Sequence, residues 1–325
     1  MNPLSAKESG NIMSKKDFTI RNYHPDDFAA YVQLHLDAEK RDQTGKPVSQ
    51  QMLAEALGHP RFRPENNLFI AEHNGSIIGY ISVFLEPGLG RALIDGLIHP
   101  SQRHKGAATR LLKHALRHAT EAGLKVAQTC ISESNEAARR LLKQLGFEYI
   151  RFFCGFRLDL TTAPLPDIDQ QEYIIGRLKP GEAQDLTEIQ NTAFAESWGF
   201  NPNTTEEIRY RISLGSCSAK DIVMAYRKTR PVAYCWTRLL GEKNPESGDT
   251  TGEIHMLGVA PAFRRKGLGR MVLTAGLSHL KGRGVTLVVL TADGEDHAAR
   301  RLYESVGFEE WTKTNWYEKK LVCDG

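Results

Sequence analysis

The sequence predicts an α/β (α+β) fold that is repeated in two tandem domains. Four observations lead to this prediction. The chain has 325 residues, enough for about two domains of ordinary size. Strand-like and helix-like segments alternate along it, and one pattern of residues occurs twice. Hydrophobic residues make up 41% of the chain and charged residues 25%, which is ordinary for a globular protein with a buried core.

The repeat consists of two blocks that return 161 residues later in the chain. The letters AARRL at 137–141 and GFE at 146–148 recur at 298–302 and 307–309. Upstream, the pattern P-x-x-R-x-x-G at 100–106 recurs at 261–267. A period this long indicates duplicated domains, because solenoid repeats are about 20 to 50 residues long. We expect one domain at 17–160, a second at 170–325, and a proline-containing linker between them at 161–169.

Each half is predicted to contain, in order, a strand, helices, several strands, a helix, a strand, a helix and a strand. In the first half, the pattern predicts a strand at 18–21, a helix opening at Pro25, a hairpin of 68–72 and 77–84 around Asn74-Gly75, and a helix with Leu112, Leu116 and Ala119 on one face. In the second half, it predicts strands at 222–226 and 232–239 around Arg230-Pro231, a strand at 253–259, a helix after Gly269, a strand at 285–290 that is buried on both faces, and a helix at 298–305 that ends at Gly307.

Composition excludes several classes of partner. The formal net charge is only +3 and no sustained block of Lys and Arg occurs, so we expect neither nucleic acid nor a membrane surface as a partner. The segment 1–16 lacks the apolar region of a signal peptide, and the longest apolar runs are strand-sized. The five cysteines are odd in number and show no metal-ligand spacing. We therefore predict a cytoplasmic protein without a metal site, either a monomer or a homodimer.

A basic, glycine-containing turn joins a predicted strand to a predicted helix. In the second half it reads RRKGLG at 264–269. Free amides at a helix N-terminus carry partial positive charge, and glycines let a ligand approach the backbone, so such a turn can bind a pyrophosphate. Alternatively, the loop only caps the helix. It lacks the G-x-G-x-x-G order of dinucleotide-binding domains, and it is not a Walker A loop.

This turn resembles the motif [R/Q]-x-x-G-x-[G/A] of the GNAT acyltransferase superfamily, and both halves contain it. The later pattern D-x-x-A-x-x-L-Y-x-x-x-G-F at 296–308 is similar to the superfamily's N-x-x-A-x-x-L-Y-x-x-x-G-F. The resemblance covers residues 17–325. It implies that each half is a mixed, strongly curved β-sheet flanked by helices. It also implies acetyl-CoA as a co-substrate, held between the splayed fourth and fifth strands.

The resemblance assigns residues to the coenzyme. Backbone amides of 265–270 would hold the pyrophosphate, 257–259 would pair with the pantetheine arm, and the Val259 amide would polarise the thioester carbonyl. Asp296 stands where the superfamily has Asn, which the first half retains as Asn135; a carboxylate there can cap a helix but would repel phosphates. The predicted coenzyme-binding residues are Leu257, Gly258, Val259, Arg264, Arg265, Lys266, Gly267, Leu268, Gly269, Arg270 and Asp296, with Arg103, Gly106 and Ala108 in the first half.

The resemblance also assigns proton transfer to the second half. Glu253 would be the general base that deprotonates an acceptor amine, and Tyr303 the general acid that protonates the leaving thiolate. Without the motif, Glu253 would be read as a solvent-facing strand residue and Tyr303 as a packed ring. His255, two residues further along the same strand face, is a rival or relay base.

The first half lacks both of these groups. At 161 residues before Glu253 and Tyr303 it has Ala92 and Leu142, which cannot transfer protons, and Asp95 is the nearest alternative. The first half keeps an open turn at Gly106. We therefore expect it to be catalytically degenerate but able to bind coenzyme.

The second half further resembles the mycothiol synthases, a family of tandem GNAT enzymes that acetylate the cysteinyl amine of a pseudodisaccharide thiol. The similar stretches are 252–254, 258–259, 267–269 and 273–277. We expect an acetyl-CoA-dependent N-acetyltransferase that acts by direct attack of the primary amine of a small molecule. The alternatives are a non-catalytic coenzyme-binding sensor or scaffold and a protein-acetylating enzyme. Trp198, Phe200 and Trp236 are candidates for lining the acceptor pocket, with core packing as the alternative for at least one of them.

Overall fold

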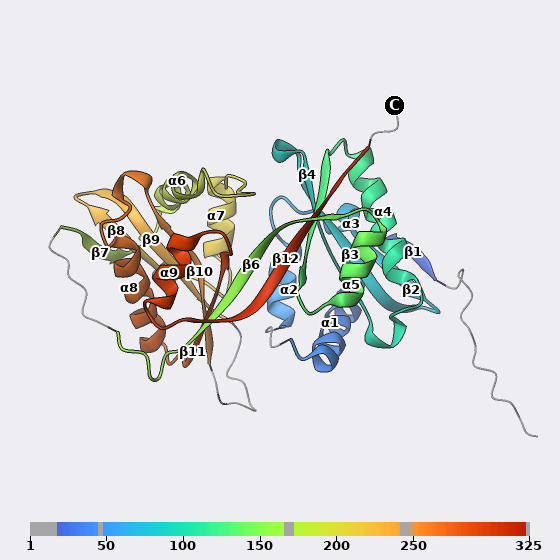
Figure 1. The fold of residues 1–325 in the computed structure, drawn as a ribbon, viewed down its shortest axis with the longest axis horizontal. Helices are drawn as coiled ribbons and strands as arrows, with labels where there is room; N and C mark the ends of the chain where they lie inside the picture. Colours follow the sequence, from blue (N-terminus) through green and yellow to red (C-terminus); the bar gives the residue numbers. More distant parts are fainter. Residues whose placement is uncertain (1–17, 45–47, 166–171, 241–247, 249, 323–325) are drawn as a thin grey trace, which may run out of the picture.

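Two halves of similar architecture share one β-sheet (Figure 1). The computed structural model describes residues 18–44, 48–165, 172–240, 248 and 250–322. The strands within these ranges are β1 (Thr19–Asn22), β2 (Leu68–His73), β3 (Ser76–Glu86), β4 (Arg91–Ile98), β5 (Val126–Ser132), β6 (Glu148–Asp159), β7 (Ile174–Arg177), β8 (Ile222–Arg227), β9 (Arg230–Leu239), β10 (Thr251–Val259), β11 (Leu287–Asp293) and β12 (Glu309–Lys320). The helices are α1 (Phe28–Asp42), α2 (Gln50–Leu57), α3 (Pro64–Asn67), α4 (Ala107–Glu121), α5 (Glu136–Gln144), α6 (Ala183–Phe194), α7 (Thr205–Ile212), α8 (Leu268–Gly282) and α9 (His297–Glu304).

Turn residues explain where the hairpins bend. Asn74 and Gly75 both have positive φ, 49° and 75°, which the tight turn between β2 and β3 requires, so that predicted hairpin is confirmed. The second hairpin turns two residues earlier than predicted. Arg227 pairs with Arg230 and Lys228 has a φ of 58°, so Lys228 and Thr229 form the turn and Pro231 lies inside β9. The proline is tolerated there because the pairing of β8 with β9 is irregular next to it.

The sheet is mixed, and helices cover both of its faces. Only β4 with β5 and β10 with β11 run parallel among the described pairs; the others are antiparallel. In the second half, α8 and α9 pack on one face of the sheet, and α6 and α7 pack on the other. The first half repeats this plan with α4 and α5 opposite α1 and α2. The mixed sheet flanked by helices is thus confirmed.

The last strand of each half crosses into the sheet of the other half. The strand order is β1-β2-β3-β4-β5-β12-β6-β11-β10-β9-β8-β7, so β12 completes the first half and β6 the second (Figure 1). The cores follow the same exchange. Phe156 of β6 is buried in the core of the second half, and Tyr317 of β12 is buried in the core of the first. The division at 17–160 and 170–325 remains a prediction about the sequence, and part of the expected linker lies outside the described residues.

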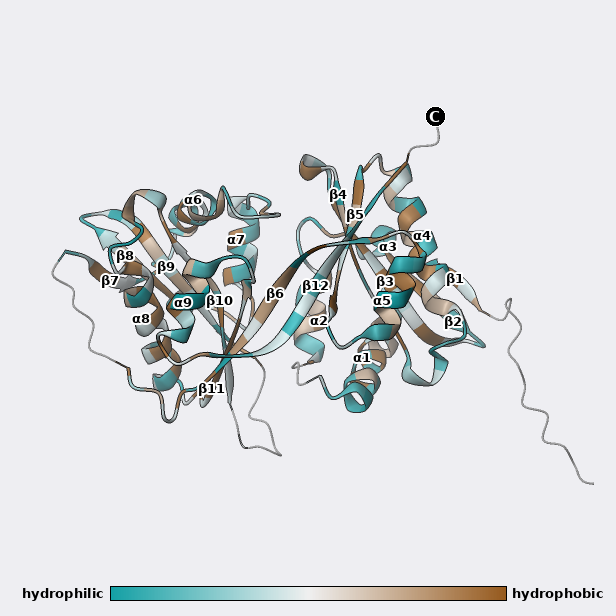
Figure 2. Cartoon of the chain, in the orientation of Figure 1, coloured by the Kyte–Doolittle hydropathy of each residue, from teal (hydrophilic) through white to brown (hydrophobic). Residues whose placement is uncertain are grey.

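The short helices α5 and α9 bury only one face. Each has one buried residue, Leu142 in α5 and Tyr303 in α9, and both helices are mostly teal in Figure 2. Gly307 follows α9 with a φ of 101°, as expected for a helix C-terminus. The strand β11 differs from the prediction because alternate residues are buried and Thr291 is exposed, so only one face is covered fully.

Two absences bear on the predicted partners. None of the helices within the described residues is both long enough and apolar enough to cross a membrane. The same residues contain no group of three or more His, Cys, Asp or Glu side chains placed to hold a metal ion.

Candidate active site

The parallel strands β10 and β11 separate beside the candidate site. They pair only through Thr251–Glu253 and Leu287–Val289. Beyond Glu253 one edge of β10 is therefore released from its neighbour. The Ala260 amide donates to the Val232 carbonyl at 2.9 Å, toward β9. Because amides alternate sides along a strand, the amides of Val259 and Leu257 point to the released edge, where a ligand can accept hydrogen bonds.

The turn before α8 leaves open space above its backbone. Gly267 begins the helix with a φ of 81°, preceded by Arg265 at 59°, and no side chain caps the first helical turn. A Cβ atom built on Gly267 would meet nothing within 4 Å. The free amides at this end of α8 thus face an unobstructed region, the arrangement that a pyrophosphate requires. The first half has the same backbone, with φ of 65° at His104 and 87° at Gly106.

The first arginine of each turn is engaged within the protein. The Arg264 guanidinium donates to the Val259 carbonyl at 3.3 Å and to the Ala193 carbonyl at 2.7 Å. The Arg103 guanidinium binds both carboxylate oxygens of Asp42, at 2.7 and 2.6 Å. These contacts fasten each turn to the rest of its half. They favour a bracing role for both side chains over direct contact with a coenzyme.

Three other predicted residues also have structural partners. Asp296 caps α9 by accepting from the amides of Ala298 and Ala299 at 3.1 and 2.9 Å, as Asn135 caps α5. The Leu268 side chain is buried in the core, so only its amide faces outward. The Arg270 guanidinium donates to the Ser305 hydroxyl at 2.6 Å.

Two of the predicted glycines lie where a side chain would clash with a neighbour, and the remaining predicted residues are partly buried or exposed. A Cβ on Gly258 would come within 2.6 Å of the Tyr234 ring, and one on Gly269 within 3.2 Å of Leu302. Ala108 of the first half, at the place of Gly269, is partly buried. Arg265 and Lys266 are exposed cations beside the open turn.

A β-bulge distinguishes β10 from β4. The register with β9 shifts between Ile254 and Met256, which leaves His255 as an extra residue. The pairing of β4 with β3 is continuous from Gly79 to Glu86. Before the bulge Ile254 faces α8, and after it Leu257 and Val259 do. The bulge therefore sets Glu253, His255 and Met256 on the opposite face, toward α6 and α7.

The bulge changes which residue of the first half corresponds to Glu253. Glu253 pairs with Val289, and the corresponding pair in the first half is Leu93 with Gln128. The counterpart of Glu253 is thus Leu93, not Ala92, because the constant spacing of 161 residues holds only after the inserted His255. Leucine has no proton to exchange. Asp95, the alternative considered for the first half, is exposed and accepts a hydrogen bond from Tyr80 at 2.7 Å.

Glu253 is tied to two basic groups. Its Oε2 lies 2.5 Å from Nε of Arg238 on β9 and 3.6 Å from Nδ1 of His255. Burial acts to raise the pKa of the carboxyl, but the hydrogen bonds and charges of His255 and Arg238 outweigh burial and lower the pKa to about 2. A carboxylate with so low a pKa is a weak proton acceptor at neutral pH. Glu253 is better placed to orient and stabilise a neighbouring base.

His255 is the neighbour suited to accept a proton. Burial lowers its pKa below 6.5, reinforced by the charge of Arg238 and opposed by Glu253, so the imidazole is neutral at pH 7. Its ring packs edge-on against Trp236, with centroids 5.4 Å apart. A neutral imidazole backed by a carboxylate is a pairing that activates amines and hydroxyls in many enzymes. Glu253, the predicted base, and His255, its predicted rival, therefore lie next to each other.

Tyr303 lies on the other side of the released strand edge. Its ring is buried in the core of the second half, 5.8 Å from Phe156 and 5.9 Å from Phe308 between centroids. Burial raises its pKa well above 10, so the hydroxyl stays protonated at physiological pH. It is thus a proton donor at every relevant pH, which the predicted role of general acid requires. The first half has buried Leu142 at this place.

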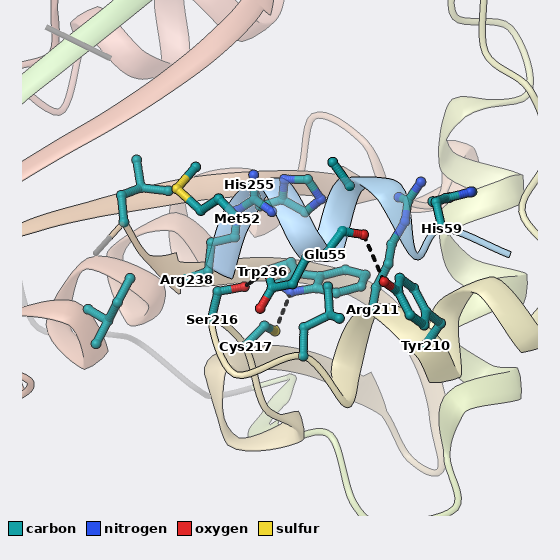
Figure 3. Close-up of a pocket in the computed structure, with 14 residues that line it drawn as sticks. Met52, Glu55, His59, Tyr210, Arg211, Ser216, Cys217, Trp236, Arg238 and His255 are labelled. Carbon is teal, nitrogen blue, oxygen red and sulfur yellow. Dashed lines mark hydrogen bonds between the residues drawn. The ribbon is translucent and has the colours of Figure 1, made fainter. Parts of the chain in front are cut away.

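A pocket opens on the face of the sheet that carries His255. Its cavity volume is about 350 Å³, and both halves contribute to its lining (Figure 3). Helix α2 of the first half supplies Met52, Glu55 and Ala56, followed by His59. The second half supplies Tyr210, Arg211, Leu214, Ser216, Cys217, Trp236, Arg238, Leu239, Leu240 and His255.

Polar contacts between the halves hold the pocket together. The Tyr210 hydroxyl donates to the Glu55 carbonyl at 2.7 Å, and the Ser216 hydroxyl donates to the Glu55 carboxylate at 2.9 Å. Nearby, the Arg91 guanidinium donates to the Gly199 carbonyl at 2.8 Å. The wall formed by the first half is therefore a fixed part of the pocket.

Of the three aromatic candidates, only Trp236 lines the pocket. It is also 1% exposed and donates to the Cys217 sulfur at 2.8 Å, so it serves the core as well. Trp198 packs on Phe153 and Trp316, and Phe200 packs on Phe194.

Sequence reasoning missed Arg238, Arg211 and the contribution of α2. Arg238 could have been found by pairing β9 with β10, since it lies directly opposite Glu253. The position of α2 depends on how the halves pack, for which the residue pattern holds no signal.

Comparison with known proteins agrees with this architecture. Residues 29–147 and 183–308 both match the model of the Acetyltransferase (GNAT) family. A mycothiol acetyltransferase of Stackebrandtia nassauensis is 30% identical over 272 residues, which cover 81% of this chain and 86% of that protein. One from Thermobispora bispora is 32% identical over 225 residues, covering 69% and 74%.

Solved structures show the same fold. A GCN5-related N-acetyltransferase from Sphaerobacter thermophilus superimposes with a TM-score of 0.75 at 19% identity, covering 94% of this chain and 96% of that one. A tandem GNAT protein from the clavulanic acid biosynthesis pathway gives a TM-score of 0.73 at 18% identity, covering 94% and 99%. With two family matches, one in each half, the chain belongs to the GNAT acetyltransferase family and is a tandem-domain N-acetyltransferase.

Proposed function

We propose that this enzyme transfers the acetyl group of acetyl-CoA to the primary amine of a small molecule, and that the second half performs the chemistry. The observation that carries the proposal is the β10 bulge. It sets Glu253 and His255 on the face of the sheet that carries the pocket, while the Val259 amide faces the opened edge of the strand. The first half has no such bulge and no proton acceptor at the place of Glu253.

In this proposal each residue has a defined task. The amides of 265–270 hold the coenzyme pyrophosphate and the Val259 amide stabilises the negative charge that develops on the thioester oxygen. His255 takes the proton from the attacking amine, and Glu253 orients the imidazole and stabilises its charged form. The Tyr303 hydroxyl donates a proton to the departing thiolate. Arg264 and Arg103 brace the turns.

The pocket favours a small acceptor over a protein. A cavity of about 350 Å³ walled by α2 is suited to a compact molecule. The matches to mycothiol acetyltransferases support an aminoacylated sugar as one acceptor to be tested. A sensor or scaffold that binds coenzyme without turnover has no need of the Glu253 and His255 pair.

The test is a panel of small amines with the full-length enzyme, read by release of the coenzyme thiol. The panel contains cysteinyl aminosugars, free aminosugars, amino acids and a basic peptide. Acetylation of a small amine by the wild-type enzyme, lost in Tyr303→Phe and His255→Gln, supports the proposal. Acetylation of the peptide alone, or coenzyme binding with no turnover of any amine, contradicts it.

A further inference from the structure

The pocket contains one cation without a protein partner. Arg211 projects from α7 and is half-buried among the pocket residues. Its guanidinium neither forms an ion pair nor donates a hydrogen bond within the described part of the chain. The other pocket guanidinium, Arg238, is held by Glu253. In Figure 3 Arg211 lies with His59 and Tyr210 at one end of the pocket and Arg238 at the other.

Nearby acidic groups are already engaged. Glu207, one turn earlier on α7, pairs with Arg61 at 2.5 Å and caps the helix through Thr204. The Glu55 carboxylate accepts hydrogen bonds from Ser216 at 2.9 Å and Gln51 at 2.9 Å. His59 cannot serve as an anion, and burial together with the charge of Arg211 lowers its pKa. No carboxylate of the described residues is therefore within pairing distance of Arg211.

A half-buried guanidinium without a counter-ion is unfavourable unless a ligand supplies one. Burial also lowers the pKa of Arg211, with only partial opposition from Glu207. A single unpaired cation matches a singly charged carboxylate, which guanidinium binds in a bidentate manner.

We propose that the acceptor carries a carboxylate that pairs with Arg211 while its amine faces His255, so that the substrate class is an amino acid or a related amino-carboxylate. This inference rests on the proposed function. Glu55 complements it, because its negative charge attracts the ammonium form in which such an acceptor enters. A neutral aminosugar conjugate would leave Arg211 unpaired.

The experiment compares matched acceptors that differ only in charge. Free amino acids and dipeptides are assayed against their carboxamides, with glucosamine and cysteinyl-glucosamine as acceptors without a carboxylate. We expect the carboxylates to have a kcat/KM about 10- to 100-fold higher, as a charge-assisted contact provides. Arg211→Gln should raise KM for the carboxylates by that factor with little change in kcat, and leave the carboxamides unaffected. Arg211→Lys should restore part of the difference.

A control and a binding measurement complete the test. Arg209→Gln, at an exposed position of the same helix, should change nothing. If none of the amines is acetylated, calorimetric titration of the coenzyme-loaded protein with N-acetylleucine and its amide decides instead, and binding of the acid alone, lost in Arg211→Gln, supports the proposal. Equal use or binding of acids and amides, or no effect of Arg211→Gln, overturns it. Failure of the proposed function would show separately, as acetylation of the peptide alone or as no turnover of any amine by the wild-type protein.

Discussion

Glu253 and Leu93 occupy the same point of the two halves, each as the last residue of its strand to pair with the neighbouring parallel strand. Two residues after Glu253 the second half inserts His255, and the first half inserts nothing. The two halves thus have the same turn geometry, but only the second has side chains at this point that can accept a proton. This difference is the physical basis for assigning the chemistry to one half.

The pH dependence of kcat can distinguish the role of His255 from that of Glu253. His255 must be neutral to accept a proton, so kcat should fall as the pH drops below its pKa, which lies below 6.5. Glu253→Gln removes a charge that raises this pKa, so the acid limb should move to lower pH and kcat/KM should fall by roughly 10² to 10⁴. His255→Gln should remove the limb altogether. An unchanged limb in His255→Gln would assign the base to another group.

Tyr303→Phe should reduce kcat while sparing the affinity for acetyl-CoA, because only the hydroxyl is lost. The raised pKa of Tyr303 also predicts no loss of activity from this group as the pH rises to about 10. Tyr226→Phe is the matched control, since its hydroxyl bonds to Glu182 in the same half, outside the site. A Tyr303→Phe enzyme with normal turnover would show that the thiolate receives its proton elsewhere.

The exchange of final strands predicts that core mutations act across the chain. Tyr317→Ala should loosen residues 18–147, and Phe156→Ala residues 172–308, each at a cost of about 3 kcal/mol in the free energy of unfolding. Hydrogen exchange of backbone amides measures which half is affected. Glu309→Ala, exposed at the start of β12, should have little effect. Loosening of each residue's own half in sequence would be inconsistent with the exchange.

Motifs and periodicity predicted much of the fold correctly. The repeat, the hairpin at Asn74-Gly75, the turns and the helices that follow them all depend on local residue patterns, which is why they could be predicted. The strand exchange could not be predicted, since β6 and β12 are both 12 residues long and a local residue pattern does not specify which half's sheet a strand joins.

The candidate site was also predictable only in part, because some of its residues are brought together by long-range packing. Glu253 and Tyr303 lie in recognisable motifs, whereas the bulge at His255 shows only as a single inserted residue between the halves. Arg211 and α2 reach the pocket through packing between the halves, which is a long-range property of the folded chain. Local pattern therefore led to the predicted coenzyme-binding residues, whereas the proposed acceptor side depends on the tertiary structure.

Turnover is expected to depend on the turn before α8 and not on the turn before α4. Gly106 and Gly267 have nearly the same φ, 87° and 81°, and a Cβ at either meets nothing within 4 Å, so valine imposes the same backbone strain at both. The decisive measurement is kcat of the two full-length variants, with thermal unfolding of each to confirm folding. Gly267→Val should abolish turnover, and Gly106→Val should leave most of it. A folded Gly106→Val enzyme as inactive as Gly267→Val would show that turnover requires both turns and that the chemistry does not belong to the second half alone.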